Sequence, residues 1–93
     1  MNRFDMVLDK TCDMCPEQYD VYDVQGNRIA YMRLRYGYFS VECPYVGGTV
    51  VFATYTRGDG CFYDEEERNI LISAAKLEIA KYYIRKEIKE KEL

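Results

Sequence analysis

Hydrophobic and polar residues alternate through residues 19–57, and turn-forming residues cut this stretch into short segments. It is rich in Val, Ile, Thr, Tyr and Phe, and its breaks fall at Gly26, Gly37 and Gly47. Short runs of this kind between glycine turns are typical of antiparallel strands joined by hairpins. The pattern therefore predicts a β-meander of four strands, at about residues 19–24, 28–36, 38–43 and 49–56.

The pattern also predicts the register of one hairpin. A two-residue loop at Tyr36 and Gly37 pairs residues of like character across the two strands. The expected pairs are Arg35 with Tyr38, Leu34 with Phe39, Arg33 with Ser40, and Met32 with Val41. One face of the hairpin is then apolar and the other polar. Around Gly26 a two-residue loop and a bulged loop both fit, so the register of that hairpin stays open.

From Asp64 onward the hydrophobic period becomes helical. Asp64 is suited to be an N-cap, with Glu67 three residues later to complete a reciprocal capping box. A helix is expected over residues 64–90. On a helical wheel its apolar residues form two stripes. The stripe assigned to the sheet contains Ile70, Ala74, Leu77, Ala80, Ile84 and Ile88, and the second contains Leu71, Ile72, Ala75, Ile79, Tyr82 and Tyr83.

The second stripe is the first candidate interaction surface. A helix lying on one sheet buries one apolar face, so the other needs a cover. That cover is either residues 1–18, expected to be irregular with an edge strand suggested by Phe4, Met6 and Leu8, or another protein. The candidate contact residues for a second copy or a host protein are Leu71, Ile72, Ile79, Tyr82 and Tyr83.

Taken as a whole, the sequence predicts a single α+β domain over residues 1–93. Its expected architecture is a four-stranded antiparallel β-meander packed by one long C-terminal α-helix.

Composition narrows the chemistry. The chain has no histidine, which excludes His-based catalytic triads and His metal ligands. Glycine-rich phosphate-binding motifs are absent as well, so neither an enzyme nor a cofactor is expected. A net charge of −3 argues against a general nucleic-acid binder. Without an apolar run of signal-peptide or membrane-span length, we expect no membrane association and a cytoplasmic protein with reduced thiols.

The four cysteines are candidate zinc ligands. Cys12 and Cys15 have the C-x-x-C spacing of zinc sites, and Cys61 and Cys43 would complete a four-thiolate set. In a meander Cys15 and Cys61 lie at one end of the sheet, whereas Cys43 lies at the other. A site made of Cys12, Cys15 and Cys61 is the remaining metal hypothesis, and ordinary free or buried thiols are the main expectation.

The polar face of the predicted hairpin is the second candidate surface. It carries Tyr31, Arg33, Arg35 and Tyr38, and alternating aromatic and guanidinium groups resemble stacking platforms for nucleotides or single-stranded nucleic acids. The alternative is a solvated face in which arginines pair with Glu42 across the strands. The acidic total charge favours this second interpretation.

Three segments carry a resemblance to known proteins. They are Cys15 to Asp23, Arg33 to Phe39, and Gly58 to Phe62, the last directly before an acidic helix start. Together they resemble small uncharacterised proteins encoded by phages and prophages of Gram-positive bacteria, over about residues 12–83. The resemblance implies no activity or site residues. It implies a setting in which small acidic accessory proteins often inhibit host enzymes or defence systems by occupying a surface.

These observations leave three hypotheses. The first is a non-enzymatic protein-interaction module that acts by surface occlusion. The second is a nucleotide or single-strand nucleic-acid binder that uses Tyr31, Arg33, Arg35 and Tyr38. The third is a small zinc-stabilised structural protein.

Overall fold

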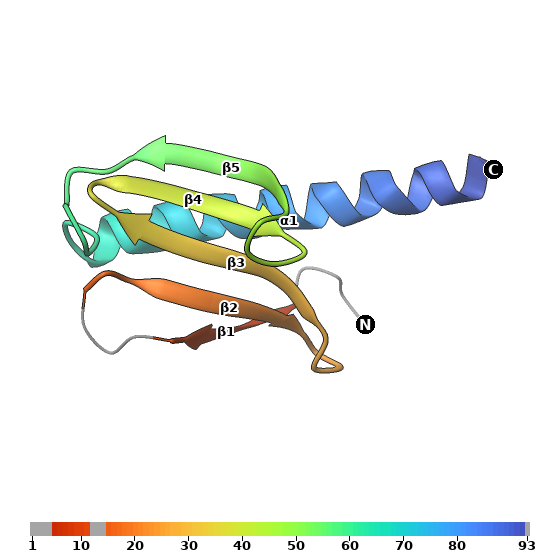
Figure 1. The fold of residues 1–93 in the computed structure, drawn as a ribbon, viewed down its shortest axis with the longest axis horizontal. Coiled ribbons are helices and arrows are strands. Elements are labelled where there is room, and N and C mark those ends of the chain that lie inside the picture. Colours follow the sequence, from red (N-terminus) through yellow and green to blue (C-terminus); the bar gives the residue numbers. More distant parts are fainter. Residues whose placement is uncertain (1–4, 12–14, 93) are drawn as a thin grey trace.

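The computed structural model describes residues 5–11 and 15–92, apart from the side chain of Glu92. In these residues, five antiparallel strands form one sheet in the order β1-β2-β3-β4-β5, and helix α1 crosses one of its faces (Figure 1). The elements are β1 Met6–Lys10, β2 Gln18–Asp23, β3 Arg28–Arg35, β4 Tyr38–Cys43, β5 Thr49–Tyr55 and α1 Glu65–Glu92. We call the face covered by α1 the inner face and the opposite one the outer face.

Strand β1 is where the sheet departs from the predicted four strands. It pairs antiparallel with β2, with Leu8 opposite Val21, and so adds a fifth strand at the edge. Met6 and Leu8 pack against the core, as their alternation indicated. Phe4, the first residue of that alternation, lies outside the described residues. The α+β class and the antiparallel meander are confirmed, and the strand number is corrected to five.

The central hairpin has the predicted register. Arg35 lies opposite Tyr38 and Leu34 opposite Phe39, and the two pairs that follow also match. The loop residues Tyr36 and Gly37 have φ angles of 53° and 75°. Positive φ at both central positions is the geometry of a type I′ turn, which fits the twist of the strands. The first hairpin, whose register the sequence left open, contains a bulge between Val21 and Tyr22.

Helix α1 begins as expected but with a different capping partner. The Asp64 carboxylate accepts a hydrogen bond from the Glu67 N–H at 2.8 Å, as an N-cap does. Glu67 does not complete a reciprocal box with Asp64. Its carboxylate accepts instead from the N–H groups of Tyr63, at 2.7 Å, and Arg57, at 3.0 Å. The helix start is therefore tied to the loop that leaves β5.

The assignment of the two helix stripes was wrong. Ala75 and Ile79 are fully buried, and Leu71, Ile72, Tyr82 and Tyr83 pack against the core. In the other stripe only Ala80 is buried, while Ile70, Leu77 and Ile88 are 59 %, 45 % and 51 % exposed. The stripe with two tyrosines offers more area to bury, and the Tyr83 hydroxyl donates a 2.6 Å hydrogen bond to the Ile29 carbonyl. The second stripe is therefore core rather than an exposed contact surface.

The core lies between α1 and the inner face of the sheet. Its buried strand residues alternate along β2, β3 and β4, and α1 lies closest to β5 and β4. The buried apolar side chains are those of Tyr19, Val21, Ala30, Met32, Leu34, Phe39, Val41, Cys43, Phe62, Ala75, Ile79 and Ala80. A helix of 28 residues is about 42 Å long. It exceeds the strands, so its last turns project past the sheet (Figure 1).

Candidate binding face

The outer face of the sheet carries the polar residues of the central hairpin. Tyr31, Arg33 and Arg35 alternate along β3 with the buried residues of the core. Tyr55 on β5 lies opposite Tyr38, and the two rings meet edge to face with centroids 5.1 Å apart. Adding Tyr36 from the turn, we define the Tyr–Arg face as Tyr31, Arg33, Arg35, Tyr36, Tyr38 and Tyr55. The structure brings all four sequence-predicted residues of this face together.

Two shallow hollows indent this region. The first has a volume of about 370 Å³ and is lined by Arg33, Arg35, Tyr36, Tyr38 and Ser40. The second, of about 540 Å³, is lined by Cys15, Pro16, Gln18, Arg35, Tyr36, Asp59 and Gly60. Arg35 and Tyr36 line both hollows. A ligand lying across the end of the hairpin would therefore contact this pair of residues from either side.

The two arginines of the Tyr–Arg face keep their charge unpaired. Within the described residues, neither Arg33 nor Arg35 forms an ion pair. Glu42, expected to pair with them, instead accepts a 2.7 Å hydrogen bond from the Gly47 N–H in the next loop. The Arg35 guanidinium lies 5.2 Å from the centre of the Tyr36 ring. Both guanidinium groups are thus available to bind an anionic group.

Tyr36 is held in an unusual position by the loop after β5. Left-handed backbone is rare for a bulky residue, yet Tyr36 adopts it, and its side chain is 78 % exposed. The neighbouring Gly37 carbonyl accepts a 2.8 Å hydrogen bond from the Thr56 N–H, and the Gly37 N–H donates to the Asp59 carbonyl. These bonds fix the hairpin tip. The aromatic ring is consequently presented to solvent on a rigid support.

A buried carboxylate anchors the same end of the molecule. Glu17 is 1 % exposed, and its carboxylate accepts hydrogen bonds from the Tyr19 hydroxyl at 2.9 Å and the Phe62 N–H at 2.8 Å. Arg68 on α1 donates two more, from Nε at 3.0 Å and from Nη2 at 3.2 Å. Such paired, fork-like bonds are among the stronger polar contacts in proteins. The network joins β2, the loop before α1 and the helix itself.

The charges in this network shift its pKa values. Burial alone would raise the pKa of Glu17, but the hydrogen bonds from Arg68, Phe62 and Tyr19 outweigh burial and lower it. Burial, together with the hydrogen bond to the Glu17 carboxylate, raises the pKa of Tyr19 to about 12. Glu17 is therefore ionised and Tyr19 is neutral at neutral pH. The cluster is a structural ion pair, because its carboxylate is fully occupied by these donors.

Comparison with known proteins adds no assignment. No protein family model matches this sequence, and searches of curated proteins and of solved structures return no match. Among the described residues, no helix is long and apolar enough to cross a membrane. The interpretation of the Tyr–Arg face therefore depends on its own geometry and charge.

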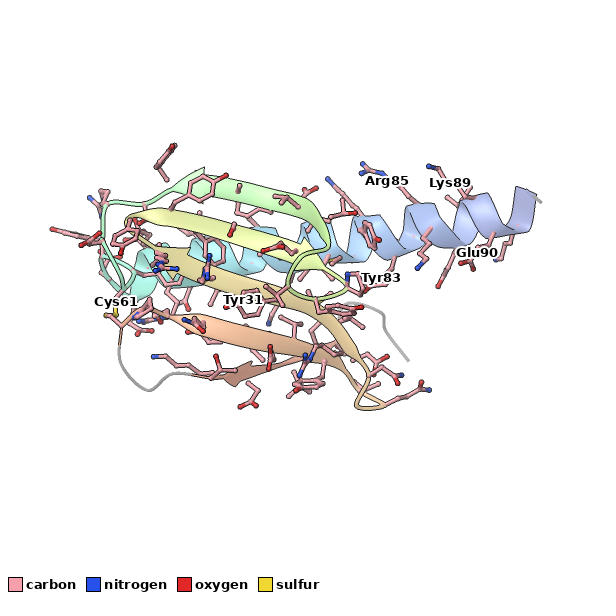
Figure 2. All side chains as sticks on the ribbon, viewed as in Figure 1. Tyr31, Cys61, Tyr83, Arg85, Lys89 and Glu90 are labelled. Atoms are coloured by element: carbon pink, nitrogen blue, oxygen red, sulfur yellow. A yellow bond between two sulfur atoms is a disulfide. The ribbon has the colours of Figure 1, made fainter. Side chains whose placement is uncertain are left out.

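The cysteines form a disulfide rather than the expected set of free thiols. Cys15 and Cys61, predicted to share one end of the sheet, are bonded to each other with Cα atoms 5.3 Å apart. Figure 2 shows Cys61 at that end, beside the loop that leads into α1. Cys43 is a free, fully buried thiol, and burial raises its pKa to about 12.

The disulfide also bears on the zinc hypothesis. Bonded sulfurs are not thiolates, so Cys15 and Cys61 cannot ligate zinc in this state. Cys12, the third proposed ligand, lies outside the described residues. In the part of the chain that the structure describes, no three His, Cys, Asp or Glu side chains are grouped to hold a metal ion.

Three residues of this region escaped sequence reasoning. Placing Tyr55 beside Tyr38 requires knowledge of the register between β4 and β5, and a bulge between Val41 and Glu42 shifts that register. Tyr36 was read only as a turn residue. Glu17 stands in a polar stretch, and its partners Phe62 and Arg68 are 45 and 51 residues away along the chain. No local pattern signals contacts at that separation.

Proposed function

We propose that this protein is a non-enzymatic interaction module that binds an acidic segment of another protein through the Tyr–Arg face. The observation that carries the proposal is that two guanidinium groups, those of Arg33 and Arg35, form no ion pair within the described residues and lie among tyrosines on a sheet face that α1 leaves open. Arginine and tyrosine are the residue types enriched where proteins bind one another. Occupying a partner's surface requires no catalytic group.

The chemistry of the face favours carboxylates as the recognised groups. Guanidinium forks bind carboxylates with two parallel hydrogen bonds, and flanking aromatic rings shield these bonds from water. The rigid hairpin tip supports this role, since ordering costs that weaken binding are paid during folding. Inhibition of a host enzyme or defence system by a small phage protein is the setting that the sequence resemblance contributes to this proposal.

Charge reversal on the face gives a direct test. The full chain is titrated against a fluorescent peptide rich in Glu and Tyr, with anisotropy as the readout. Arg33→Glu combined with Arg35→Glu should weaken binding at least about tenfold, because close like charges repel. Lys76→Glu combined with Lys91→Glu is the matched control on α1, with the same change in net charge. Equal losses in both double variants would mean that total charge, not the face, determines binding.

A second candidate function is binding of single-stranded nucleic acid by the same face. The alternation of Tyr31, Arg33, Arg35 and Tyr38 favours it, because bases stack on aromatic rings and phosphates pair with guanidinium groups. The net charge of −3 opposes it. A labelled mixed-sequence DNA strand, titrated at physiological salt, distinguishes the two. Submicromolar binding that Arg33→Ala and Arg35→Ala both weaken, with no binding of the acidic peptide, would put nucleic acid first.

A further inference from the structure

Strand β5 is an edge strand without the usual protection. Its seven residues, Thr49–Tyr55, include no charged residue and no proline. Natural proteins commonly place a charge or a proline on exposed edges, because an open strand readily pairs with another one. The opposite edge strand, β1, carries Asp9 and Lys10. The two edges of the sheet thus differ in the feature that prevents strand pairing.

The backbone of β5 offers hydrogen-bonding groups to a further strand. The Thr56 N–H donates to the Gly37 carbonyl at 2.8 Å, which fixes which residues face β4. Because bonding direction alternates along an antiparallel ladder, Phe52 and Thr54 bond toward β4, and the N–H groups of Ala53 and Tyr55 point outward. The carbonyl groups of a strand added at this edge would accept hydrogen bonds from these N–H groups.

Two grooves of opposite charge lie between β5 and α1. One, of about 420 Å³, is at the start of β5 and is lined by Thr49, Val50, Val51, Glu78, Tyr82, Arg85, Lys86 and Lys89. The other, of about 340 Å³, is at the end of β5 and is lined by Tyr55, Arg57, Asp64, Glu66, Glu67, Ile70 and Leu71. Figure 2 shows Arg85 and Lys89 leaving α1 on the side where β5 lies, with Glu90 on the opposite side. The first groove is mainly basic and the second mainly acidic.

An exposed apolar stripe follows the same helix. Ile70, Leu77 and Ile88 are 59 %, 45 % and 51 % exposed, and spacings of seven and eleven residues put them on one flank. Ile70 also lines the acidic groove beneath the end of β5. On the helical wheel this stripe lies opposite the buried Ala75 and Ile79, so most of it faces away from the sheet.

We propose that a second copy of this chain binds at the open edge of the sheet, with the two β5 strands paired antiparallel about a two-fold axis near Phe52. Phe52 is the middle of β5, and the two grooves lie toward the two ends of that strand. The two-fold axis then brings the basic groove of each copy against the acidic groove of the other. The occupant is a second copy because only an antiparallel copy supplies both complementary ends at once.

The spacing of the two helices supports this arrangement. Because α1 lies beneath β5 and β4, its symmetry mate lies about two strand spacings away, roughly 10 Å. Helices pack with axes about 8–10 Å apart. The sides of the two helices that line the grooves would then face each other across the axis. The dimer would leave the arginines of the Tyr–Arg face open on its outer side, whereas Tyr55 also lines the acidic groove and would lie at the interface.

Sedimentation equilibrium of the full chain at micromolar concentrations tests the proposal. We expect twice the monomer mass. Ala53→Pro should give a folded monomer, checked by circular dichroism, because proline removes an outward N–H that the second strand needs and leaves the bonds to β4 in place. Ala53→Ser is the matched control, since it keeps that N–H. A wild-type chain that stays monomeric, or a dimer that Ala53→Pro leaves intact, overturns the proposal.

A charge exchange tests the predicted orientation. Glu66→Lys and Lys89→Glu should each weaken the dimer, by about tenfold in dissociation constant, through repulsion across the grooves. The double variant should recover most of that loss, since the two charges are then exchanged across the interface. This result would exclude a parallel pairing. If the double variant is as weak as the two single changes combined, the antiparallel arrangement is wrong.

Discussion

The two faces of the central hairpin come from the same stretch of chain, residues 28–43, yet they have different roles. On the inner face Met32, Leu34 and Phe39 are almost completely buried under α1. On the outer face Arg33 and Arg35 have no acidic partner among the described residues. Side chains at alternate positions along each strand thus have different roles. One set packs in the core, and the other set is proposed to bind a partner. A change on one face should leave the other almost untouched.

The largest effect is expected from the inner face. Phe39→Ala should reduce the free energy of unfolding by about 3–5 kcal/mol, because it removes a fully buried ring and leaves a cavity. Urea denaturation followed by circular dichroism would measure this loss. Ser40→Ala, the adjacent residue on the outer face, is the control and should change stability by less than about 0.5 kcal/mol. Similar losses from both changes would mean that the two faces are not separate.

The next effect concerns the Glu17–Arg68 network, which joins the sheet to α1 at one end of the molecule. Arg68→Met should cost about 3 kcal/mol, because it removes both guanidinium bonds to the buried Glu17 carboxylate and leaves it the longer ion pair with Lys10, at 3.7 Å. Chemical denaturation at neutral pH would show the loss. Glu65→Gln is a suitable control, since it changes the exposed partner of Arg68 only. A loss below about 1 kcal/mol would indicate that the other donors to Glu17 are sufficient.

The same ion pair predicts a dependence on acid. The pKa of Glu17 in the folded chain is below its ordinary value of 4.5. Its stabilising contribution is therefore present above pH 4.5 and is lost as the pH falls through the lower, folded-state pKa. Unfolding free energies measured between neutral and acidic pH should fall more steeply in the wild type than in Glu17→Gln. Parallel curves would contradict the assignment.

Reduction of the disulfide should lower stability by an amount similar to that expected for Arg68→Met. Cys15 and Cys61 close a loop of 46 residues, and breaking such a loop typically costs about 2–4 kcal/mol. Thermal unfolding with and without a reducing agent would measure the difference. A Cys15→Ser chain serves as the control, because it should unfold at the same temperature under both conditions.

The smallest expected effect has the opposite sign. Tyr36→Asn should stabilise the chain by roughly 0.5–1 kcal/mol, because Asn tolerates the left-handed backbone that a bulky ring does not. The same change should weaken binding of the acidic peptide. Together, urea denaturation and anisotropy would show whether Tyr36 lowers the stability of the fold while strengthening peptide binding. A loss of stability would place the Tyr36 ring within the fold.

Local and periodic features of the fold could be predicted from the sequence. The register of the central hairpin followed from a period of two and one turn, and the helix start followed from Asp64. Both depend on residues close together in the chain. Which of the two apolar stripes of the helix faces the sheet was predicted wrongly, since both stripes contain enough aliphatic residues to cover a sheet. Only the shape of the sheet decides that Ile79 is buried and Leu77 is exposed.

The candidate site shows the same division between features set by nearby residues, which the sequence predicts, and features set by tertiary contacts, which it does not. Tyr31, Arg33, Arg35 and Tyr38 were found because strand periodicity puts them on one face. That the two arginines form no ion pair in the described part of the chain was not predictable, because the Glu42 carboxylate accepts a hydrogen bond from the Gly47 N–H instead. The disulfide between Cys15 and Cys61 depends on side-chain approach rather than on topology alone. Sharing an end of the sheet was a necessary condition for it and not a sufficient one.

The last turns of α1 extend past the sheet, so the helix is a stiff projection as well as a cover for the core. Helical segments keep a fixed rise of about 1.5 Å per residue, so they act as spacers, whereas flexible linkers do not. The end of α1 therefore has a defined distance and direction from the Tyr–Arg face, on the far side of the sheet (Figure 1). A probe attached there would report the orientation of the whole domain without obstructing that face.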